Sequence, residues 1–188
     1  KYCKALTEEE KYSLLITETD TGINLSKNHP EFLAQFYFFK GYGYEYTNNQ
    51  YVKAVIYYEK SLELAQKYKN LRLETSNLMR LNYMYYSVKD HEKGRKLIEY
   101  VKSIVDTVKD QDSKATMLGS IGEYYLDRSE FENFITYKLK AINLLLADKK
   151  PDEMKVNNIG VSYLQIADAY NDMGQYEKTL EYCKYAEP

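Results

Sequence analysis

Few residues of this sequence have types and spacings suited to chemistry. The two histidines, His29 and His91, lie far apart in predicted loops, and the two cysteines, Cys3 and Cys183, lie near opposite ends of the chain. A zinc site needs three or four such ligands at short, recurrent spacings, and nucleophilic catalysis needs a nucleophile, a base and an orienting group. No such set can be assembled from the sequence. We therefore predict a protein that is not an enzyme, with no metal, no cofactor and two free thiols.

The segment Gly41-Tyr42-Gly43 resembles a fragment of a phosphate-binding loop. Such loops follow a β-strand and carry further glycines or a lysine at fixed positions. Here the segment lies inside a helical pattern and lacks the third glycine. We interpret Gly41 instead as a residue that lets two helices approach each other closely.

The composition favours an all-helical chain and excludes some partners. Among 188 residues there are only 3 Pro and 8 Gly, with 22 Tyr and no Trp, and so few turn formers are typical of helical proteins. The net charge is −2 with acids and bases interspersed, so the basic stripe of a nucleic-acid-binding protein is missing. No stretch approaches the roughly 20 apolar residues that span a bilayer. For this segment we expect no nucleic-acid and no membrane partner, and the compartment stays open.

One pattern recurs four times along the chain. It centres on a tyrosine that follows a compact residue by three positions, with a polar turn and then a ring residue further on. The tyrosines are Tyr44, Tyr85, Tyr125 and Tyr170; the compact residues are Gly41, Asn82, Gly122 and Ala167; the ring residues are Tyr51, His91, Phe131 and Tyr176. Because His91 takes a ring position of the pattern, we interpret it as structural.

A second set of recurring positions follows each ring residue: Ala54/Tyr58/Ser61, Gly94/Ile98/Val101, Phe134/Lys138/Ala141 and Thr179/Cys183/Ala186. Together the two sets resemble the tetratricopeptide repeat, and the stretch 167–186 is most similar to its consensus. The resemblance covers roughly residues 30–188. It implies an all-α, right-handed α-solenoid of antiparallel helix pairs, in which each pair covers the apolar face of its neighbour.

The sequence departs from the standard repeat in three ways. The compact residues are 41, 40 and 45 positions apart, against about 34 in the standard repeat. Lys40 replaces an apolar residue, and Phe134 stands where a small residue is usual, so we expect the helices of the third copy to be pushed apart. The long spacing resembles the repeat arrays of bacterial signalling and transcription-regulating proteins.

We expect a single domain over residues 1–188, with repeats at about 30–68, 71–109, 112–147 and 152–187 and a partial repeat at 1–29. The first helix should begin with a capping box from Thr7 to Glu10 and kink or split near Gly22. No polar capping helix follows the last repeat, so we expect a part of a larger bacterial protein. The predicted helices are 7–27, 31–47, 51–68, 71–88, 91–109, 113–128, 131–147, 152–172 and 176–187.

In the family that the chain resembles, fixed positions of each first helix line an inner groove. Carried over, they predict a groove that is aromatic at one end and acidic at the other. No Lys or Arg occupies these positions, so the carboxylate clamp of the co-chaperone members is not expected. A ligand with apolar side chains and one or two basic groups fits better. The candidate binding residues are Phe38, Tyr42, Glu45, Tyr46, Met79, Tyr83, Tyr86, Glu123, Asp127, Asp168 and Asp172.

The resemblance implies a module that binds a protein or peptide, as the sensory or regulatory part of a bacterial signal-transduction or transcription-regulating protein. Two other functions fit the same pattern. One is an intracellular receptor for a small signalling peptide, and the other is a scaffold whose repeats form a homo-oligomer. Alternatively, the groove binds no partner and is merely solvated, or another part of the same protein fills it.

Overall fold

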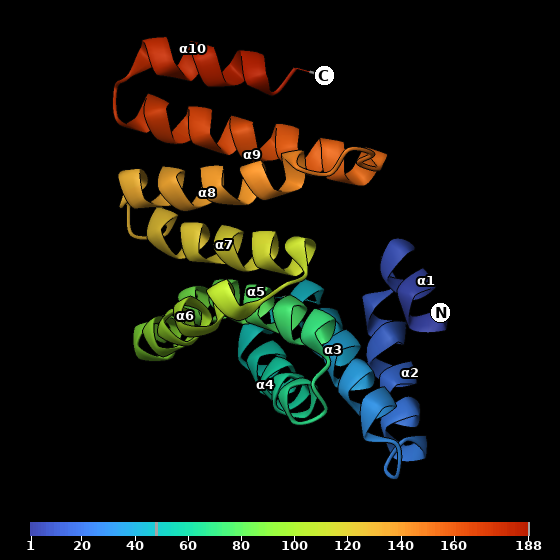
Figure 1. The fold of residues 1–188 in the computed structure, drawn as a ribbon. Helices are drawn as coiled ribbons and strands as arrows, with labels where there is room; N and C mark the ends of the chain where they lie inside the picture. Colours follow the sequence, from blue (N-terminus) through green and yellow to red (C-terminus); the bar gives the residue numbers. More distant parts are fainter. Residues whose placement is uncertain (48, 188) are drawn as a thin grey trace. The chain divides into compact units, whose positions relative to one another are not determined.

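The protein is described by a computed structural model that covers residues 1–47 and 49–187. Within these residues all regular structure is helical, which confirms the predicted fold class (Figure 1). The elements are α1 (Tyr2–Glu8), α2 (Tyr12–Leu25), α3 (Pro30–Tyr46), α4 (Tyr51–Lys67), α5 (Leu71–Ser87), α6 (His91–Ile104), the 3-10 helix η1 (Val105–Thr107), α7 (Gln111–Leu126), α8 (Phe131–Leu146), α9 (Glu153–Asp172) and α10 (Tyr176–Tyr185).

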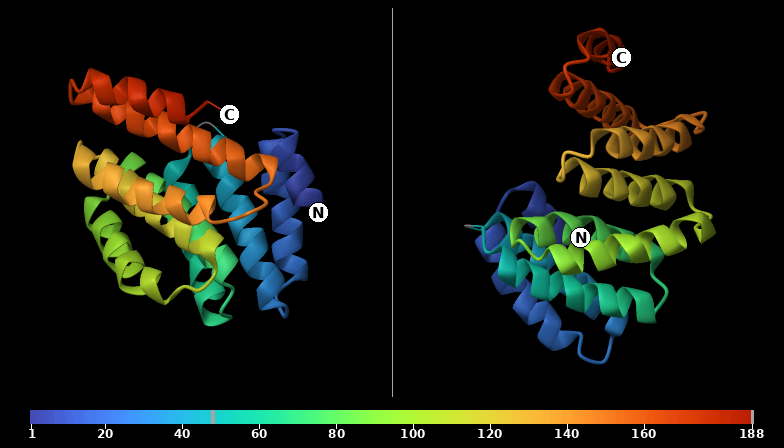
Figure 2. Two further views of the ribbon diagram at one scale, coloured as in Figure 1. Left: turned by 45° about the horizontal axis from the view of Figure 1, so that its top comes forward. Right: turned by 90° about the vertical axis from the view of Figure 1, so that its left-hand side faces the viewer.

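The helices group into two compact units, Lys1–Arg95 and Lys96–Pro188, and α6 contains the boundary. In the first unit α2 packs on α3, α3 on α4, and α4 on α5. In the second unit α7 packs on α8, α8 on α9, and α9 on α10, and both views of Figure 2 show α9 and α10 side by side. The single domain over 1–188 and its repeat boundaries stay a prediction.

The predicted first helix, 7–27, is wrong, because the chain forms two helices there. Thr7 lies in the last turn of α1, where its Oγ1 donates to the carbonyl oxygen of Lys4 at 2.6 Å. Glu10 has a left-handed backbone with φ of 56°, so it belongs to the turn and forms no capping box with Thr7. The predicted break at Gly22 is also absent, since α2 continues to Leu25 and Gly22 is buried against the ring of Phe36.

The later helices begin and end close to the predicted positions. Pro30 is the first residue of α3, where its missing N–H costs nothing. The predicted helix 91–109 is shorter, because α6 ends at Ile104 and η1 follows. The start at 152 shifts by one residue, since Asp152 is the N-cap of α9 and accepts from the backbone N–H of Lys155 at 2.8 Å.

The turns between helices share one backbone geometry. Within the described residues, each left-handed residue stands two positions before the next helix: Glu10, Asn49, Lys69, Lys89, Ser129 and Gly174. After all of them except Asn49, the following N–H donates to the carbonyl oxygen five positions earlier, at 2.8–2.9 Å. This is the Schellman pattern that ends a helix. The acceptors include the carbonyls of Tyr85, Tyr125 and Tyr170, so the recurring tyrosine also fixes where each first helix ends.

The compact positions of the repeat are buried, as predicted: Gly41, Asn82, Gly122 and Ala167. A Cβ added at Gly41 would lie 2.9 Å from the ring of Tyr58, which is fully buried. Gly41 is therefore a packing glycine. Of the recurring tyrosines, Tyr85 is buried and the others are half-buried. Each of the half-buried tyrosines stacks on a second tyrosine: Tyr44 on Tyr57, Tyr125 on Tyr137 and Tyr170 on Tyr182.

Two of the three departures from the repeat pattern, Phe134 and Lys40, are accommodated in the core. Phe134 is fully buried, yet a Cβ added at Gly122 would lie only 3.4 Å from its carbonyl oxygen. The helices α7 and α8 are therefore close together, and the expectation that Phe134 pushes them apart is wrong. Lys40 is buried as well, where it pairs with the carboxylate of Asp20 and lies 4.7 Å from the ring centroid of Tyr57. This pairing lets a charged residue take an apolar position.

Candidate functional site

The first unit contains a pocket of about 470 Å³ formed by α3, α5 and the start of α4. We call it the aromatic pocket. It is lined by Glu45, Tyr46, Asn49, Tyr51, Met79, Arg80 and Tyr83. Four of the predicted groove residues are among them, namely Glu45, Tyr46, Met79 and Tyr83, so the structure brings together part of the predicted aromatic end.

Glu45 is one of the charged residues of this pocket, and its side chain is fully engaged. It is only 6% exposed. Its Oε2 accepts from the hydroxyl of Tyr58 at 2.5 Å, and its Oε1 accepts from Nη1 of Arg80 at 3.0 Å. Burial raises the pKa of Tyr58, and the Glu45 carboxylate raises it further, so the Tyr58 hydroxyl keeps its proton for this bond. Glu45 therefore has no free oxygen to attract a basic ligand.

Arg80 is the second charged residue, and it crosses from α5 to α3. Besides Glu45, its Nη1 donates to the hydroxyl of Tyr46 at 3.3 Å. Its guanidinium carbon lies 4.8 Å from the ring centroid of Tyr42, a cation–π contact. Burial lowers the pKa of Arg80, but Glu45, Tyr58 and Tyr46 together outweigh burial, so this pKa lies above its usual value. The side chain is 25% exposed, and its Nε is buried without a partner among the described residues.

Arg80 was missed by the sequence analysis, which expected no Lys or Arg in the groove. The groove positions were chosen by their spacing on one helix face, and Arg80 follows Met79 on the flank of that face. A long side chain reaches the groove from there. The available signal was Glu45 itself, because a carboxylate among aromatic positions of the neighbouring helix needs a cation nearby.

Three tyrosines form a stack beside the pocket. The ring centroids of Tyr42 and Tyr46 are 4.6 Å apart, and those of Tyr46 and Tyr12 are 5.1 Å apart. Burial raises the pKa of Tyr42 to about 12, with Tyr46 adding to the shift. Tyr42 is thus a supporting residue that holds Arg80 and Tyr46 in place. Tyr12, from α2, is a further contact that the sequence analysis did not predict.

The remaining aromatic candidates divide into exposed and packed residues. Phe38 is half-buried and lies against Tyr58, with 5.5 Å between the ring centroids, so it does not line the pocket. Tyr86 is exposed on α5, one turn beyond Tyr83 and outside the pocket lining. Four of the predicted residues offer 41–49% of their surface to solvent: Tyr46, Met79, Tyr83 and Tyr86.

The predicted acidic residues lie in the second unit and are not equivalent to one another. Glu123 accepts from Nζ of the buried Lys138 at 2.6 Å, so its charge is neutralised. Asp127 is the half-buried C-cap of α7. Burial raises its pKa to about 6, with the Glu123 carboxylate adding to the shift. Asp168 and Asp172 are exposed on α9, so they are the two that present charge to a partner.

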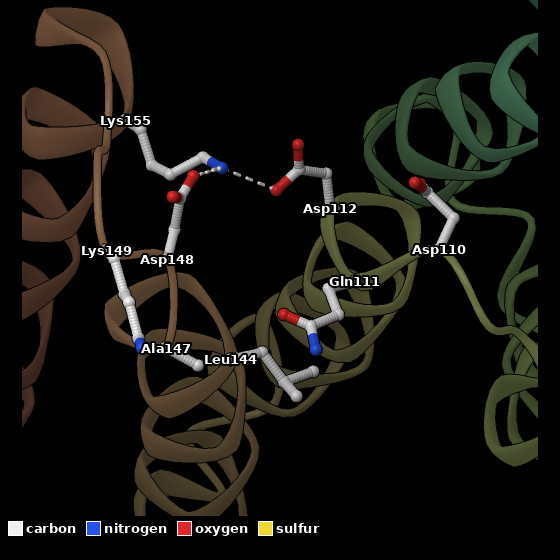
Figure 3. Close-up of a pocket in the computed structure, with 8 residues that line it drawn as sticks. All are labelled: Asp110, Gln111, Asp112, Leu144, Ala147, Asp148, Lys149 and Lys155. Atoms are coloured by element: carbon white, nitrogen blue, oxygen red, sulfur yellow. Dashed lines mark hydrogen bonds and ion pairs between the residues drawn. The ribbon is translucent and has the colours of Figure 1, made fainter.

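The second unit has its own pocket of about 430 Å³, where α7 and α9 begin and α8 ends (Figure 3). In Figure 3, Lys155 extends between two carboxylates, and its Nζ lies 2.9 Å from Asp112 and 2.7 Å from Asp148. These bonds raise the pKa of Lys155, and Lys155 lowers that of Asp148. Because these charges satisfy one another, this pocket offers a ligand less than the aromatic pocket does.

Over residues 1–47 and 49–187, no group of three or more His, Cys, Asp and Glu side chains is arranged to hold a metal ion. None of the helices in the same residues has both the length and the apolar character needed to cross a membrane.

Comparison with known proteins identifies the fold. The sequence matches no protein-family model and no curated protein. Its structure is similar to the crystal structure of BtubC (BKLC) from P. vanneervenii, with a TM-score of 0.73 at 13% identity, over 98% of this chain and 75% of that one. It is also similar to the TPR-like repeats of a putative kinesin light chain from Podosopora anserina, with TM-scores of 0.71 and 0.69 in two crystal structures. These are 12% identical, over 98% of this chain and 89% and 90% of those. The chain therefore has the fold of the tetratricopeptide-type helical repeat proteins.

Proposed function

We propose that this chain is a non-catalytic module that binds a protein or peptide, and that the aromatic pocket is its principal contact. The TPR-like fold suggests a protein-interaction module. The observation that carries the proposal is the pocket of about 470 Å³ with exposed Tyr46, Met79 and Tyr83 at its rim. Rigid aromatic side chains are frequent binding hot spots, because they bury a large area at a small cost in entropy.

The pocket favours an extended peptide with an apolar side chain. Met79, Tyr83 and Tyr86 follow one another along the exposed face of α5, so a segment that fills the pocket can continue along the helix. In the second unit, Asp168 and Asp172 expose carboxylates on α9, which favour a partner with one or two basic groups there. Each unit supports this proposal by its own surface.

We further propose that the module is the sensory or regulatory part of a bacterial signalling or transcription-regulating protein. The support is the repeat spacing of 40 to 45 residues, which is longer than the standard repeat of about 34. An intracellular receptor for a small signalling peptide uses the same pocket. Self-association is checked separately by analytical ultracentrifugation of the wild-type chain.

The test is a selection of random 12-residue peptides on the immobilised chain, followed by affinity measurements with the enriched peptides. The variant Met79→Ala/Tyr83→Ala/Tyr86→Ala removes only exposed side chains of α5. We expect its affinity to fall about 100-fold or more, at roughly 1 kcal/mol for each truncated side chain. The matched control is Val52→Ala/Ile56→Ala/Tyr68→Ala, which truncates three exposed apolar residues outside the pocket.

The control variant should bind as the wild type does. Circular dichroism checks that both variants keep their helices. If the folded α5 variant binds the selected peptides as tightly as the wild type, the partner uses another surface and the proposed pocket is wrong.

A further inference from the structure

We propose that the aromatic pocket recognises a side-chain carboxylate, an Asp or Glu flanked by aromatic or aliphatic residues, and that Arg80 is the group that binds it. This inference rests on the proposed function and names the chemistry of the ligand. It replaces, for this pocket, the basic ligand that the sequence pattern favoured.

The donors of Arg80 are unevenly used. A guanidinium has five N–H groups in a planar fork. Both bonds to Glu45 and Tyr46 are made by Nη1. Nε is buried without a partner, and Nη2 makes no hydrogen bond within residues 1–47 and 49–187 and is not among the buried unpaired atoms. Nη2 is therefore open to solvent.

The unused donors lie along one edge of the guanidinium. Nε and Nη2 point to the same side of the fork, away from the Nη1 edge that holds Glu45. Nε is buried, so Nη2 is the donor of this edge that a ligand can reach. A carboxylate that binds Nη2 forms a charge-assisted hydrogen bond, which is stronger than a bond between neutral groups.

The other lining residues disfavour a cation at the same place. Among the described residues that line the pocket, Glu45 is the only acid, and both of its oxygens are engaged by Tyr58 and Arg80. An ammonium or guanidinium group would therefore meet the charge of Arg80 with no carboxylate left to bind it. The pocket walls accept the apolar part of the ligand, since Tyr83 and Met79 are exposed there.

The surface around the pocket favours an acidic residue within a chain over a chain end. Tyr86 lies one turn beyond Tyr83 on α5, outside the pocket, and Tyr51 contacts Tyr83 at the start of α4, with 6.3 Å between their ring centroids. Apolar surface thus continues from Tyr83 in two directions, along α5 to Tyr86 and across to Tyr51 of α4. The peptide residues before and after an internal Asp or Glu can both contact this surface. A peptide that binds through its C-terminal carboxylate has no residues after the carboxylate, so part of the surface would stay uncovered.

The first experiment uses three small probes with the same ring and different heads: 3-phenylpropanoate, 3-phenylpropanamide and 2-phenylethylammonium. Each is titrated into the full chain, and NMR follows the methyl signal of Met79 and the ring signals of Tyr83. We expect the carboxylate to shift these signals at about ten-fold lower concentration than the other two, because charge-assisted bonds are the stronger ones. Equal or tighter binding of the ammonium, or no shift with any probe, would overturn the inference.

The second experiment removes the guanidinium without leaving a buried charge. In Glu45→Gln/Arg80→Gln both members of the pair become neutral, so the carboxylate preference should disappear while the fold persists. Arg80→Lys keeps the charge and loses the fork, and it should weaken 3-phenylpropanoate binding about ten-fold. The control is Arg72→Gln, which changes an exposed arginine of the same helix and should bind as the wild type. A double variant or an Arg80→Lys variant with the wild-type preference for the carboxylate would exclude Arg80.

The selected peptides separate this inference from the proposed function. We expect an enriched Asp or Glu beside an aromatic or aliphatic residue, and an Asp→Asn or Glu→Gln peptide should bind about ten-fold more weakly, even when its C-terminus is amidated. Selected peptides that contain no acid, but lose affinity for the Met79→Ala/Tyr83→Ala/Tyr86→Ala variant, would refute carboxylate recognition by Arg80. The proposed function would still stand. Probe binding without any selected peptide would refute the proposed function alone.

Discussion

The helix pairs α3–α4 and α7–α8 fill the same repeat positions with different residues. In α4 the small Ala54 precedes the large Tyr58, whereas in α8 Phe134 and Lys138 stand at the matching places, and all four are buried. Tyr58 ends on the carboxylate of Glu45, and Lys138 ends on that of Glu123. The comparison teaches that these two positions accept different pairs of buried residues. In both pairs, a buried polar side chain of the second helix is paired with a carboxylate of the first helix.

The largest difference between the two pairs should appear when the polar contacts are broken. The side chain of Glu45 is 5% exposed, against 35% for Glu123. Removing the partner of a buried charge is costly, so we expect Arg80→Met to lower the free energy of unfolding by about 3 kcal/mol. Lys138→Met should lower it by about 1 kcal/mol, because water can solvate Glu123. Urea denaturation measures both, and equal losses would contradict the comparison.

A second difference should appear at the packing glycines. An added Cβ would lie 2.9 Å from the Tyr58 ring at Gly41, but no closer than 3.4 Å to any atom at Gly122. We expect Gly41→Ala to destabilise the chain by about 2 kcal/mol, and Gly122→Ala to change its stability by about 0.5 kcal/mol or less. Gly122→Leu should be as harmful as Gly41→Ala or more so, because a longer side chain meets the backbone of α8. Thermal melts rank the three variants, and a Gly122→Leu melt like that of the wild type would refute the packing role.

The third difference concerns Tyr46 and Asp127, which occupy the same place relative to Gly41 and Gly122. Asp127 has a pKa of about 6, above its ordinary 3.8. Between these values the folded state binds more protons than the unfolded state, so this residue lowers stability as pH rises from about 4 to 6. Asp127→Asn should therefore match the wild type near pH 4 and be more stable above pH 6. The expected gain is about 1 kcal/mol, since the half-buried side chain is partly screened by water.

Thermal melts across this pH range check the sign of the effect. A variant that is less stable than the wild type above pH 6 would show that the Asp127 carboxylate has a favourable partner in the folded state. Asp168→Asn, which changes an exposed acid of the same unit, is the control for the removal of one negative charge.

The smallest expected effect is a difference in thiol reactivity between the two cysteines. Both are free thiols; Cys3 is buried and Cys183 is partly exposed. Burial raises the pKa of Cys3, which reduces its thiolate fraction. With a thiol reagent at pH 8, we expect Cys183 to react about ten-fold faster than Cys3, or more. After unfolding, both thiols should react. Mass spectrometry of the labelled peptides identifies the faster site, and faster labelling of Cys3 would show that α1 detaches.

The elements with periodic residue patterns could be predicted from the sequence. The features that depend on a single residue could not. The compact residues and the helices from α3 onward followed from the repeat, because burial selects residue size at fixed spacing. The turn at Glu10 was missed because its residue type does not suit a left-handed backbone. In the site, spacing on one helix face found Met79 and Tyr83. It did not find Arg80, because the contact of Arg80 with Glu45 depends on side-chain reach between helices.

The turns have a consequence for how such a chain changes over evolutionary time. Among residues 1–47 and 49–187, five of the six left-handed residues are not glycine, and they range from Glu10 to Ser129. Backbone bonds to carbonyls such as that of Tyr125 hold their geometry, so the side chains at these sites contribute little to it. These five sites show that such a turn accepts residues other than glycine, although β-branched residues and proline suit a left-handed backbone poorly. This tolerance is one physical reason why a chain that is 13% identical to BtubC has a similar fold, with a TM-score of 0.73.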